Sequence, residues 1–184
     1  GGHLVAEWYA PGEGPQSWSA SWSMAKSFAS ALVGIAIDQG KIADVDVSMA
    51  TFFPDWAGTD KAKIRLRDVL HMESGLQWSE DYNPADTAAS DIIQMGIVPD
   101  QLAYAASRPV AYAPGTRFNY SSGDAMLLSH VIEVATGMPA DEYAQQMLFG
   151  PLGIDQVEWW RDGAGHTLTY CCLDTTSRNY ARMG

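Results

Sequence analysis

The sequence predicts an α+β fold, in which an antiparallel sheet is flanked by helices and interrupted by a largely helical insertion. A strand-like segment opens the chain, a mostly helical block follows, and two strand-like segments return near the C-terminus. Of the 184 residues, 47% are hydrophobic and 18% are charged, which is typical of a globular protein with a packed core. Because few strands are visible for a chain of this length, we expect the sheet to be incomplete in this chain.

The first part of the chain carries the signals of one strand and one helix. Residues 4–10 read as a strand that is closed by the Pro- and Gly-rich turn at 11–15. An apolar helix is expected from Ser23 to Gln39, where a glycine follows. Residues 44–47 read as a short extended piece, and 48–53 as a helical turn that ends before a proline.

The middle of the chain reads as a series of helices. The segment from 78 to 87 is polar and aromatic, and we expect it to be a loop. The pattern at 123–135 is amphipathic and ends before Gly137, a common helix terminator. Helical spacing is found at residues 65–72, 88–95, 100–107, 123–135 and 140–148.

Two strands and a helix are predicted at the end of the chain. The strands span 156–161 and 166–172, and Asp174 is expected to cap the final helix. The only cysteines, Cys171 and Cys172, are adjacent. Since a disulfide between neighbours is strained, we expect them to be two small residues that face opposite sides of the second strand.

The charge and motif content exclude several classes of function. The formal net charge is −11, with no Lys/Arg cluster, so nucleic acid is not an expected partner. The sequence contains no run of about twenty apolar residues, so we predict no transmembrane segment. No zinc spacing, P-loop or dinucleotide fingerprint occurs, so we predict no metal and no cofactor. The sequence leaves the oligomeric state and the cellular compartment open.

Ser23 and Lys26 form the first candidate for chemistry. Residues three apart on a helix share one face, so their side chains are expected to point the same way. A serine hydroxyl becomes a useful nucleophile when a base lies within hydrogen-bond reach. A lysine amine held against the apolar run that follows is partly desolvated, which makes Lys26 a candidate base.

Tyr120 is the second candidate. A Pro-Gly turn at 114–115 precedes a short extended stretch, and Ser122 or Asp124 is expected to cap the helix that follows. Tyr120 is therefore predicted on a fixed loop just before a helix, with its hydroxyl free to project. A tyrosine beside a lysine ammonium can work as a base or a proton shuttle.

Taken in order, these motifs resemble the serine beta-lactamase-related hydrolases over essentially the whole chain. The resemblance is strongest to the class C beta-lactamase-like esterases and the 6-aminohexanoate-oligomer hydrolases. No single motif is specific, but their order and spacing together are. The motifs are Trp22–Ser27, Asp68–Leu76, Pro114–Thr116 with Tyr120–Gly123, and Tyr180–Gly184.

The resemblance implies a role for each candidate residue. Ser23 would be the acylated nucleophile, and Lys26 its base or the group that keeps Tyr120 ionised. Tyr120 would pass the proton to the leaving group. In the Glu80-Asp81-Tyr82 segment, Tyr82 matches a substrate-contacting tyrosine of the 6-aminohexanoate-oligomer hydrolases. Ser122 would contact substrate as well. The implied substrate is a small ester or amide, cleaved through an acyl-enzyme.

Two departures from the family pattern keep alternatives open. Ser122 stands where the family often has Asn, and it lacks the two-sided reach of an amide. The family's late Lys/His-x-Gly motif does not follow Tyr120, so the chain is expected to be C-terminally truncated. The alternatives are a non-catalytic ligand-binding or scaffold domain, or an inactive fragment, of the same fold. Among enzymes, a beta-lactamase or a peptidase is the second choice. A Ser-His-Asp hydrolase is disfavoured because the Gly-x-Ser-x-Gly elbow is missing.

The expected organisation has three parts. Residues 1–44 would contain the N-terminal strand and the nucleophile-bearing helix of the α/β part. Residues 45–155 would form the mostly helical part. Residues 156–184 would return to the α/β part with its last strands and helix.

Overall fold

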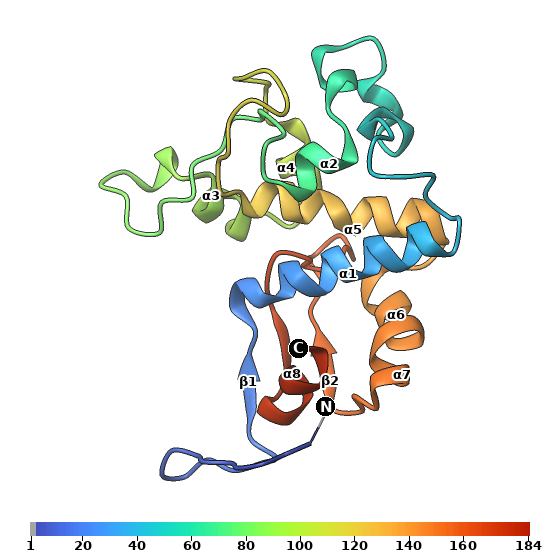
Figure 1. The fold of residues 1–184 in the computed structure, drawn as a ribbon. Coiled ribbons are helices and arrows are strands. Elements are labelled where there is room, and N and C mark those ends of the chain that lie inside the picture. The colour runs from blue at the N-terminus through green and yellow to red at the C-terminus, as the bar shows by residue number, and fades with distance from the viewer. Residues whose placement is uncertain (1–2) are drawn as a thin grey trace.

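A computed structural model describes residues 3–184 and has the predicted α+β fold (Figure 1). Its sheet has three strands, β1 (Trp18–Ala20), β2 (Val157–Trp159) and β3 (Leu173–Thr176), in the order β1-β3-β2. Both pairings are antiparallel. The central strand therefore comes from the end of the chain and joins the N-terminal strand to β2. A sheet of this size is small for the chain, as expected.

Helix α1 (Ala25–Asp38) begins directly after a 3₁₀ turn at Trp22–Met24, so the predicted helix is confirmed. One stripe of the helix is buried and the opposite face is exposed, which is the pattern of a helix packed on a core. Phe28 lies edge-on against aromatic rings from the sheet side of the molecule, Trp159 and Tyr180. The buried stripe consists of Ala25, Phe28, Ala29, Leu32, Val33 and Ala36.

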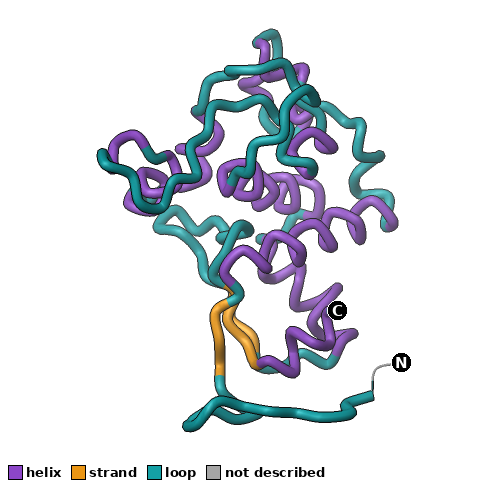
Figure 2. The backbone as a smooth tube through the Cα atoms, turned by 60° about the vertical axis from the view of Figure 1, so that its left-hand side comes forward, coloured by secondary structure: helices purple, strands orange, loops and turns teal. Residues whose placement is uncertain are grey.

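Helix α5 (Ser122–Thr136) is the central helix of the molecule. It packs against α1 and against α4 (Gln101–Ser107), and its first eight residues are all buried. Figures 1 and 2 show α1 and α5 side by side across the middle of the molecule. The helix ends at Gly137, which has a left-handed conformation with φ 76°, as the sequence predicts.

The remaining helices lie on either side of this central pair. In Figure 1, α2 and α4 lie above α5, α3 lies beside its left end, and α6, α7, α8 and the sheet lie below α1. Within residues 3–184, no helix is long and apolar enough to cross a membrane. The three-part division of the chain stays a prediction. The bounds of these remaining helices are α2 Leu66–Leu70, α3 Asp91–Ile97, α6 Ala140–Ala144 followed by a π-helical turn at Gln145–Phe149, α7 Gly150–Leu152 and α8 Ser177–Met183. Short 3₁₀ turns span Met49–Thr51, Pro54–Trp56, Asp60–Lys63 and Thr87–Ala89.

The strand predicted at residues 4–10 is wrong. This segment has no strand structure, and its apolar side chains are exposed, Val5 at 94% and Trp8 at 85%. A strand needs a partner for its backbone groups, and β3 pairs instead with residues 18–20. The segment is tied to the rest of the chain by an ion pair between Glu7 and Arg178.

The second late strand and the cap of the last helix also differ from the prediction. Residues 166–172 are not a strand, because the backbone turns where Cys171 N–H donates to Leu168 O, and Cys172 has a left-handed φ of 64°. Cys171 and Cys172 are joined in a disulfide, so they do not face opposite sides of a strand. Asp174 lies inside β3, and the cap of α8 is Thr176.

Candidate active site

Ser23 lies in the 3₁₀ turn that leads into α1, and its side chain is exposed. The preceding residue, Trp22, has a left-handed φ of 45°. Such a conformation is costly for a residue with a bulky side chain, and structures retain it chiefly at functional sites. The turn presents Ser23 to solvent at the N-terminus of α1, where the helix dipole favours negative charge.

Lys26 connects Ser23 to two other parts of the chain. Its Nζ lies 3.1 Å from Ser23 Oγ, 3.2 Å from Ser122 Oγ and 3.0 Å from the carbonyl oxygen of Tyr170. An ammonium has three N–H donors, so the three acceptors account for all of them. The side chain is half-buried between α1, the start of α5 and the turn before β3.

Two aromatic rings face the same amine. The ring centroid of Tyr120 lies 5.1 Å from Lys26 Nζ, and that of Tyr170 lies 5.8 Å away. Both distances are within the range of cation–π attraction, which stabilises the charged amine. Tyr120 is 38% exposed on the loop before α5, whereas Tyr170 is buried and donates its hydroxyl to Gln101. Burial raises the pKa of Tyr170 to about 12.

Glu80 accepts hydrogen bonds from three residues around the site. Its Oε1 accepts from the Ser122 hydroxyl and from the Tyr82 hydroxyl, each at 2.6 Å. Its Oε2 accepts from the Ser122 backbone N–H at 2.9 Å and from the indole N–H of Trp78. Glu80 thus joins the loop at 78–82 to the first residue of α5 and, through Ser122, to Lys26.

Tyr82 lies on this loop and is 65% exposed. Partial burial and the hydrogen bond that it donates to Glu80 raise the pKa of Tyr82 above the usual range of a phenol. Its hydroxyl is therefore neutral near pH 7 and serves as a donor. An exposed aromatic ring beside the site can contact a substrate, and this role of Tyr82 stays a prediction.

Local packing explains why the loop holds this position. The Trp78 ring lies so close to Gly123 that an added Cβ would come within 2.6 Å of it. Asn119 Nδ2 donates to the carbonyl oxygen of Trp78 at 3.0 Å. Ser121 caps α5 by accepting the Asp124 N–H at 2.9 Å. Because position 123 is a glycine, the Trp78 ring can pack against it while its indole N–H donates to Glu80.

Asp124 is a buried carboxyl in the first turn of α5. Its Oδ1 accepts a hydrogen bond of 2.7 Å from the Ser74 hydroxyl, and its Oδ2 is buried without a partner among the described residues. Burial raises the pKa of Asp124 to about 7, against the lowering effect of the Ser74 hydrogen bonds. The pair ties α5 to the turn after α2.

The structure brings the sequence-predicted site residues together. Ser23 and Ser122 both contact Lys26, the Tyr120 ring faces Lys26, and Tyr82 reaches Ser122 through Glu80. Two further groups were missed. Glu80 had a signal, because it opens the segment that contains Tyr82. No signal in the sequence indicates the Tyr170 carbonyl, because every residue has a backbone oxygen.

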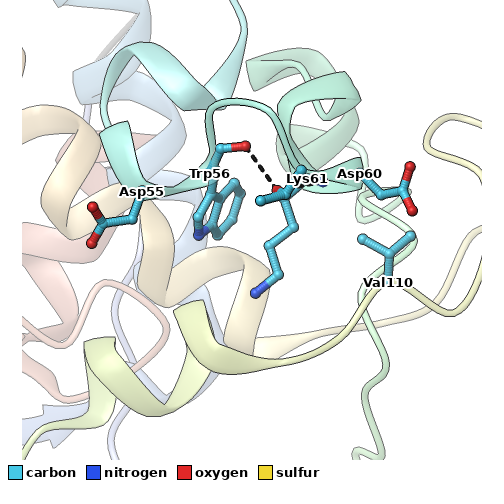
Figure 3. Close-up of a pocket in the computed structure, with 6 residues that line it drawn as sticks. Asp55, Trp56, Asp60, Lys61 and Val110 are labelled. Atoms are coloured by element: carbon cyan, nitrogen blue, oxygen red, sulfur yellow. Dashed lines mark hydrogen bonds between the residues drawn. The ribbon is translucent and has the colours of Figure 1, made fainter.

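A separate cavity lies away from this cluster (Figure 3). It has a volume of about 310 Å³ and is bounded by the turns at residues 55–61 and by Val110. Lys61 Nζ lies 5.1 Å from the Trp56 ring centroid and donates to the Ala106 carbonyl at 2.6 Å. None of the four residues around the Lys26 amine lines this cavity, so it is not part of the candidate site.

The sequence profile of the Beta-lactamase family matches residues 1–179. The chain therefore belongs to the Beta-lactamase family, and the resemblance predicted from its motifs is confirmed.

Individual proteins and solved structures are also similar to this chain. A protein named "Putative D-alanyl-D-alanine carboxypeptidase" from Salmonella agona (strain SL483) is 30% identical over 122 residues, which is 63% of this chain and 28% of that protein. A solved structure titled "Putative 6-aminohexanoate-dimer hydrolase from Bacillus anthracis" superposes with a TM-score of 0.83 at 17% identity, over 97% of this chain and 49% of that one. The structure of a class C beta-lactamase superposes with a TM-score of 0.68 at 19% identity, over 92% of this chain and 50% of that one.

The extent of these matches limits what they show. The chain spans about half the length of the two solved structures and 28% of the curated relative. At these identities the structural matches show the fold, and the family membership shows that the homologues are hydrolases.

Proposed function

We propose that this protein is a serine hydrolase that cleaves small carboxylic esters or amides through an acyl-enzyme on Ser23. The observation that carries the proposal is the 3.1 Å distance between Lys26 Nζ and Ser23 Oγ at the start of α1. A base within hydrogen-bond reach is what a serine nucleophile requires. The names of the relatives, which include a carboxypeptidase and a 6-aminohexanoate-dimer hydrolase, support the same reaction class.

The contacts of Lys26 fit a base that gains and loses one proton. A neutral amine keeps two N–H donors, which the Ser122 hydroxyl oxygen and the Tyr170 carbonyl can accept at 3.2 and 3.0 Å. Its lone pair then faces Ser23, whose proton it can take. After the transfer, the ammonium donates to the same partners and is stabilised by the Tyr120 ring.

The reaction follows in two halves. Ser23 Oγ bonds to the substrate carbonyl carbon as its proton moves to Lys26, and the carbonyl π electrons become an oxyanion. The N-terminal turn of α1 favours that negative charge. When the carbonyl reforms, the bond to the leaving group breaks, and the proton held by Lys26 passes through the Tyr120 hydroxyl to the departing nitrogen or oxygen. Water then attacks the carbonyl carbon of the acyl group while its proton moves to Lys26. The bond between this carbon and Ser23 Oγ breaks, the proton returns to Ser23 Oγ, and the acid is released.

Tyr82 and Ser122 are proposed to contact the substrate during these steps. Tyr82 is exposed beside the site, and Ser122 is the first residue of α5, within hydrogen-bond reach of Lys26. Tyr82 offers an apolar ring face to the acyl or leaving group, and its hydroxyl is held by Glu80.

The test is mass spectrometry of the protein after exposure to a fluorophosphonate, a reagent that phosphonylates activated serines with loss of fluoride. A single adduct on Ser23, absent in Ser23→Ala and retained in Ser30→Ala, supports the proposal. Ser30 is a suitable control because it is an exposed serine on the same helix. Absence of an adduct in the folded wild-type protein contradicts it. Ligand binding without any adduct would favour a non-catalytic binding domain.

A peptidase acting on D-amino-acid peptides is the second candidate. The name of the Salmonella relative favours it, at 30% identity over 122 residues. Release of D-alanine from a D-alanyl-D-alanine peptide, compared with release of p-nitrophenol from p-nitrophenyl acetate, separates the two. A higher kcat/KM for the peptide would establish the peptidase.

A further inference from the structure

We infer that Glu80 is a positioning residue, which fixes the direction of the Ser122 hydroxyl and thereby holds the Lys26 amine in line with Ser23. This inference rests on the proposed function, because it concerns how the proposed base is oriented. Glu80 reaches the amine only through Ser122, so it acts on the chemistry indirectly.

Glu80 is the acceptor in each of these hydrogen bonds. The Trp78 indole N–H and the Ser122 backbone N–H can only donate, and both meet Oε2. The hydroxyls of Ser122 and Tyr82 both meet Oε1 at 2.6 Å. A carboxylate with two acceptor oxygens satisfies all of these donors at once. Hydrogen bonds to a charged acceptor are roughly twice as strong as neutral ones, so this arrangement is well determined.

The direction of the Ser122 hydroxyl follows from this arrangement. A serine hydroxyl has one proton, and here Glu80 accepts it. Ser122 Oγ then offers only lone pairs to Lys26 Nζ, 3.2 Å away. With the Tyr170 carbonyl as a second acceptor at 3.0 Å, two positions of the amine are committed to donation whether the amine is neutral or charged. The third position is the one that faces Ser23.

Glutamine has the same shape as glutamate but cannot accept hydrogen bonds at both ends of its side chain. Its amide nitrogen carries two protons, so one end of the side chain would meet donors. If the nitrogen faced Trp78 and the Ser122 backbone, donors would oppose donors. If it faced the two hydroxyls, the Ser122 hydroxyl would reverse and donate to Lys26. In that case it would compete with Ser23 for the lone pair of the neutral amine.

The same carboxylate oxygen also accepts from Tyr82, which lies on the substrate-facing loop. Loss of the charge therefore disturbs two neighbours, and a single substitution cannot separate them. The double variant Glu80→Gln with Ser122→Ala separates the two effects, because Ser122→Ala removes the hydroxyl through which Glu80 is inferred to act. Asp81→Asn is the matched control, since Asp81 is an exposed carboxylate one position along the same loop.

The experiment measures the rate constant of Ser23 acylation by p-nitrophenyl acetate, from the p-nitrophenol burst and from the mass of the adduct. Glu80→Gln is expected to acylate about 100-fold more slowly than wild type, a typical cost of misplacing a catalytic group. Asp81→Asn is expected to match wild type. In the Ser122→Ala background, Glu80→Gln is expected to cause a much smaller further loss, because only the contact with Tyr82 among the two hydroxyl contacts of Glu80 remains to be disturbed. Near-UV circular dichroism checks that each variant is folded.

The contrary results are distinct. If wild type is acylated and Glu80→Gln is equally fast, the inference fails and the proposed function stands. Equal slowing by Glu80→Gln in both the wild-type and Ser122→Ala backgrounds also overturns it, because Glu80 would then act by stabilising the loop rather than through the hydroxyl. If wild type itself forms no adduct on Ser23, the proposed function fails and the inference falls with it.

Discussion

Lys26 and Ser122 are 96 positions apart in the sequence, yet the Lys26 amine donates to the Ser122 hydroxyl over 3.2 Å. This contact joins the first turn of α1 to the first residue of α5, the two helices that pack together at the centre of the molecule. The buried apolar stripe of α1 and the burial of the first eight residues of α5 fix the two helix starts relative to each other. The geometry of the site is therefore a consequence of core packing.

Replacing Lys26 with Met should abolish most of the acylation of Ser23. Methionine keeps the length and the apolar stem but removes the amine, so no base lies within reach of Ser23 Oγ. We expect the acylation rate to fall by about 10²–10⁴-fold, the usual contribution of general base catalysis. A p-nitrophenyl acetate burst assay measures this rate. Lys41→Met, at an exposed position, should leave it unchanged, and an active Lys26→Met variant would show that another group is the base.

The hydroxyl of Tyr120 should matter for turnover, while its ring supports the Lys26 ammonium. Tyr120→Phe keeps the ring that lies 5.1 Å from Lys26 Nζ and removes only the proposed proton carrier. We expect kcat for amide hydrolysis to fall by about 10²–10⁴-fold, with little change in thermal stability. Tyr112→Phe provides the control, because Tyr112 is a comparably exposed tyrosine at 45%. If both variants lose the same activity, the assignment of Tyr120 is wrong.

Asp124 should make the stability of the protein depend on pH. Burial raises its pKa from the ordinary 3.8 to about 7, so the folded state holds a proton that the unfolded state releases between these values. The contribution of this proton is present below pH 4 and is lost as the pH rises through 7. The loss is on the order of 4 kcal/mol.

Urea unfolding of wild type and Asp124→Asn between pH 4 and 8 measures this contribution. The free energy of unfolding of wild type should fall relative to that of the variant over this range, because asparagine does not titrate. Parallel curves for the two proteins would show that Asp124 does not carry a raised pKa.

Two glycine substitutions should have opposite effects on stability. At Gly123, an added Cβ would lie 2.6 Å from the Trp78 ring, so Gly123→Ala should destabilise the fold by about 1–3 kcal/mol. It should also slow acylation, because the displaced indole donates to Glu80. At Gly34, within α1, an added Cβ meets nothing within 4 Å, and Gly34→Ala should stabilise by roughly 0.5–1 kcal/mol. Thermal denaturation distinguishes them, and equal effects would contradict the packing at Gly123.

The sequence predicts best what local pattern determines. The apolar spacing of α1 and the glycine after α5 locate both helices, and the spacing of Ser23 and Lys26 on one helix brings these side chains together. The Pro-Gly turn and the helix start that follows it predict Tyr120 on a fixed loop, and the family resemblance adds Ser122 as a substrate contact. These features depend on neighbours in the chain, or on motifs whose order is visible in the sequence.

The rest depends on partners that are distant in the sequence. Residues 4–10 are rich in apolar and aromatic residues like a strand, but β3 pairs with residues 18–20. The Cys171–Cys172 disulfide and the Tyr170 carbonyl near Lys26 both belong to a turn that was read as a strand. Glu80 was visible beside Tyr82, but its role depends on a contact with Ser122, which lies 42 positions away.

The central claim is that Lys26 activates Ser23, and mass spectrometry after a short exposure to p-nitrophenyl acetate tests it most directly. The account predicts a single acetyl adduct on Ser23 in the wild-type protein, and its loss in Lys26→Met under the same conditions. An adduct that forms equally well in Lys26→Met, or a folded wild-type protein that forms none, would contradict it.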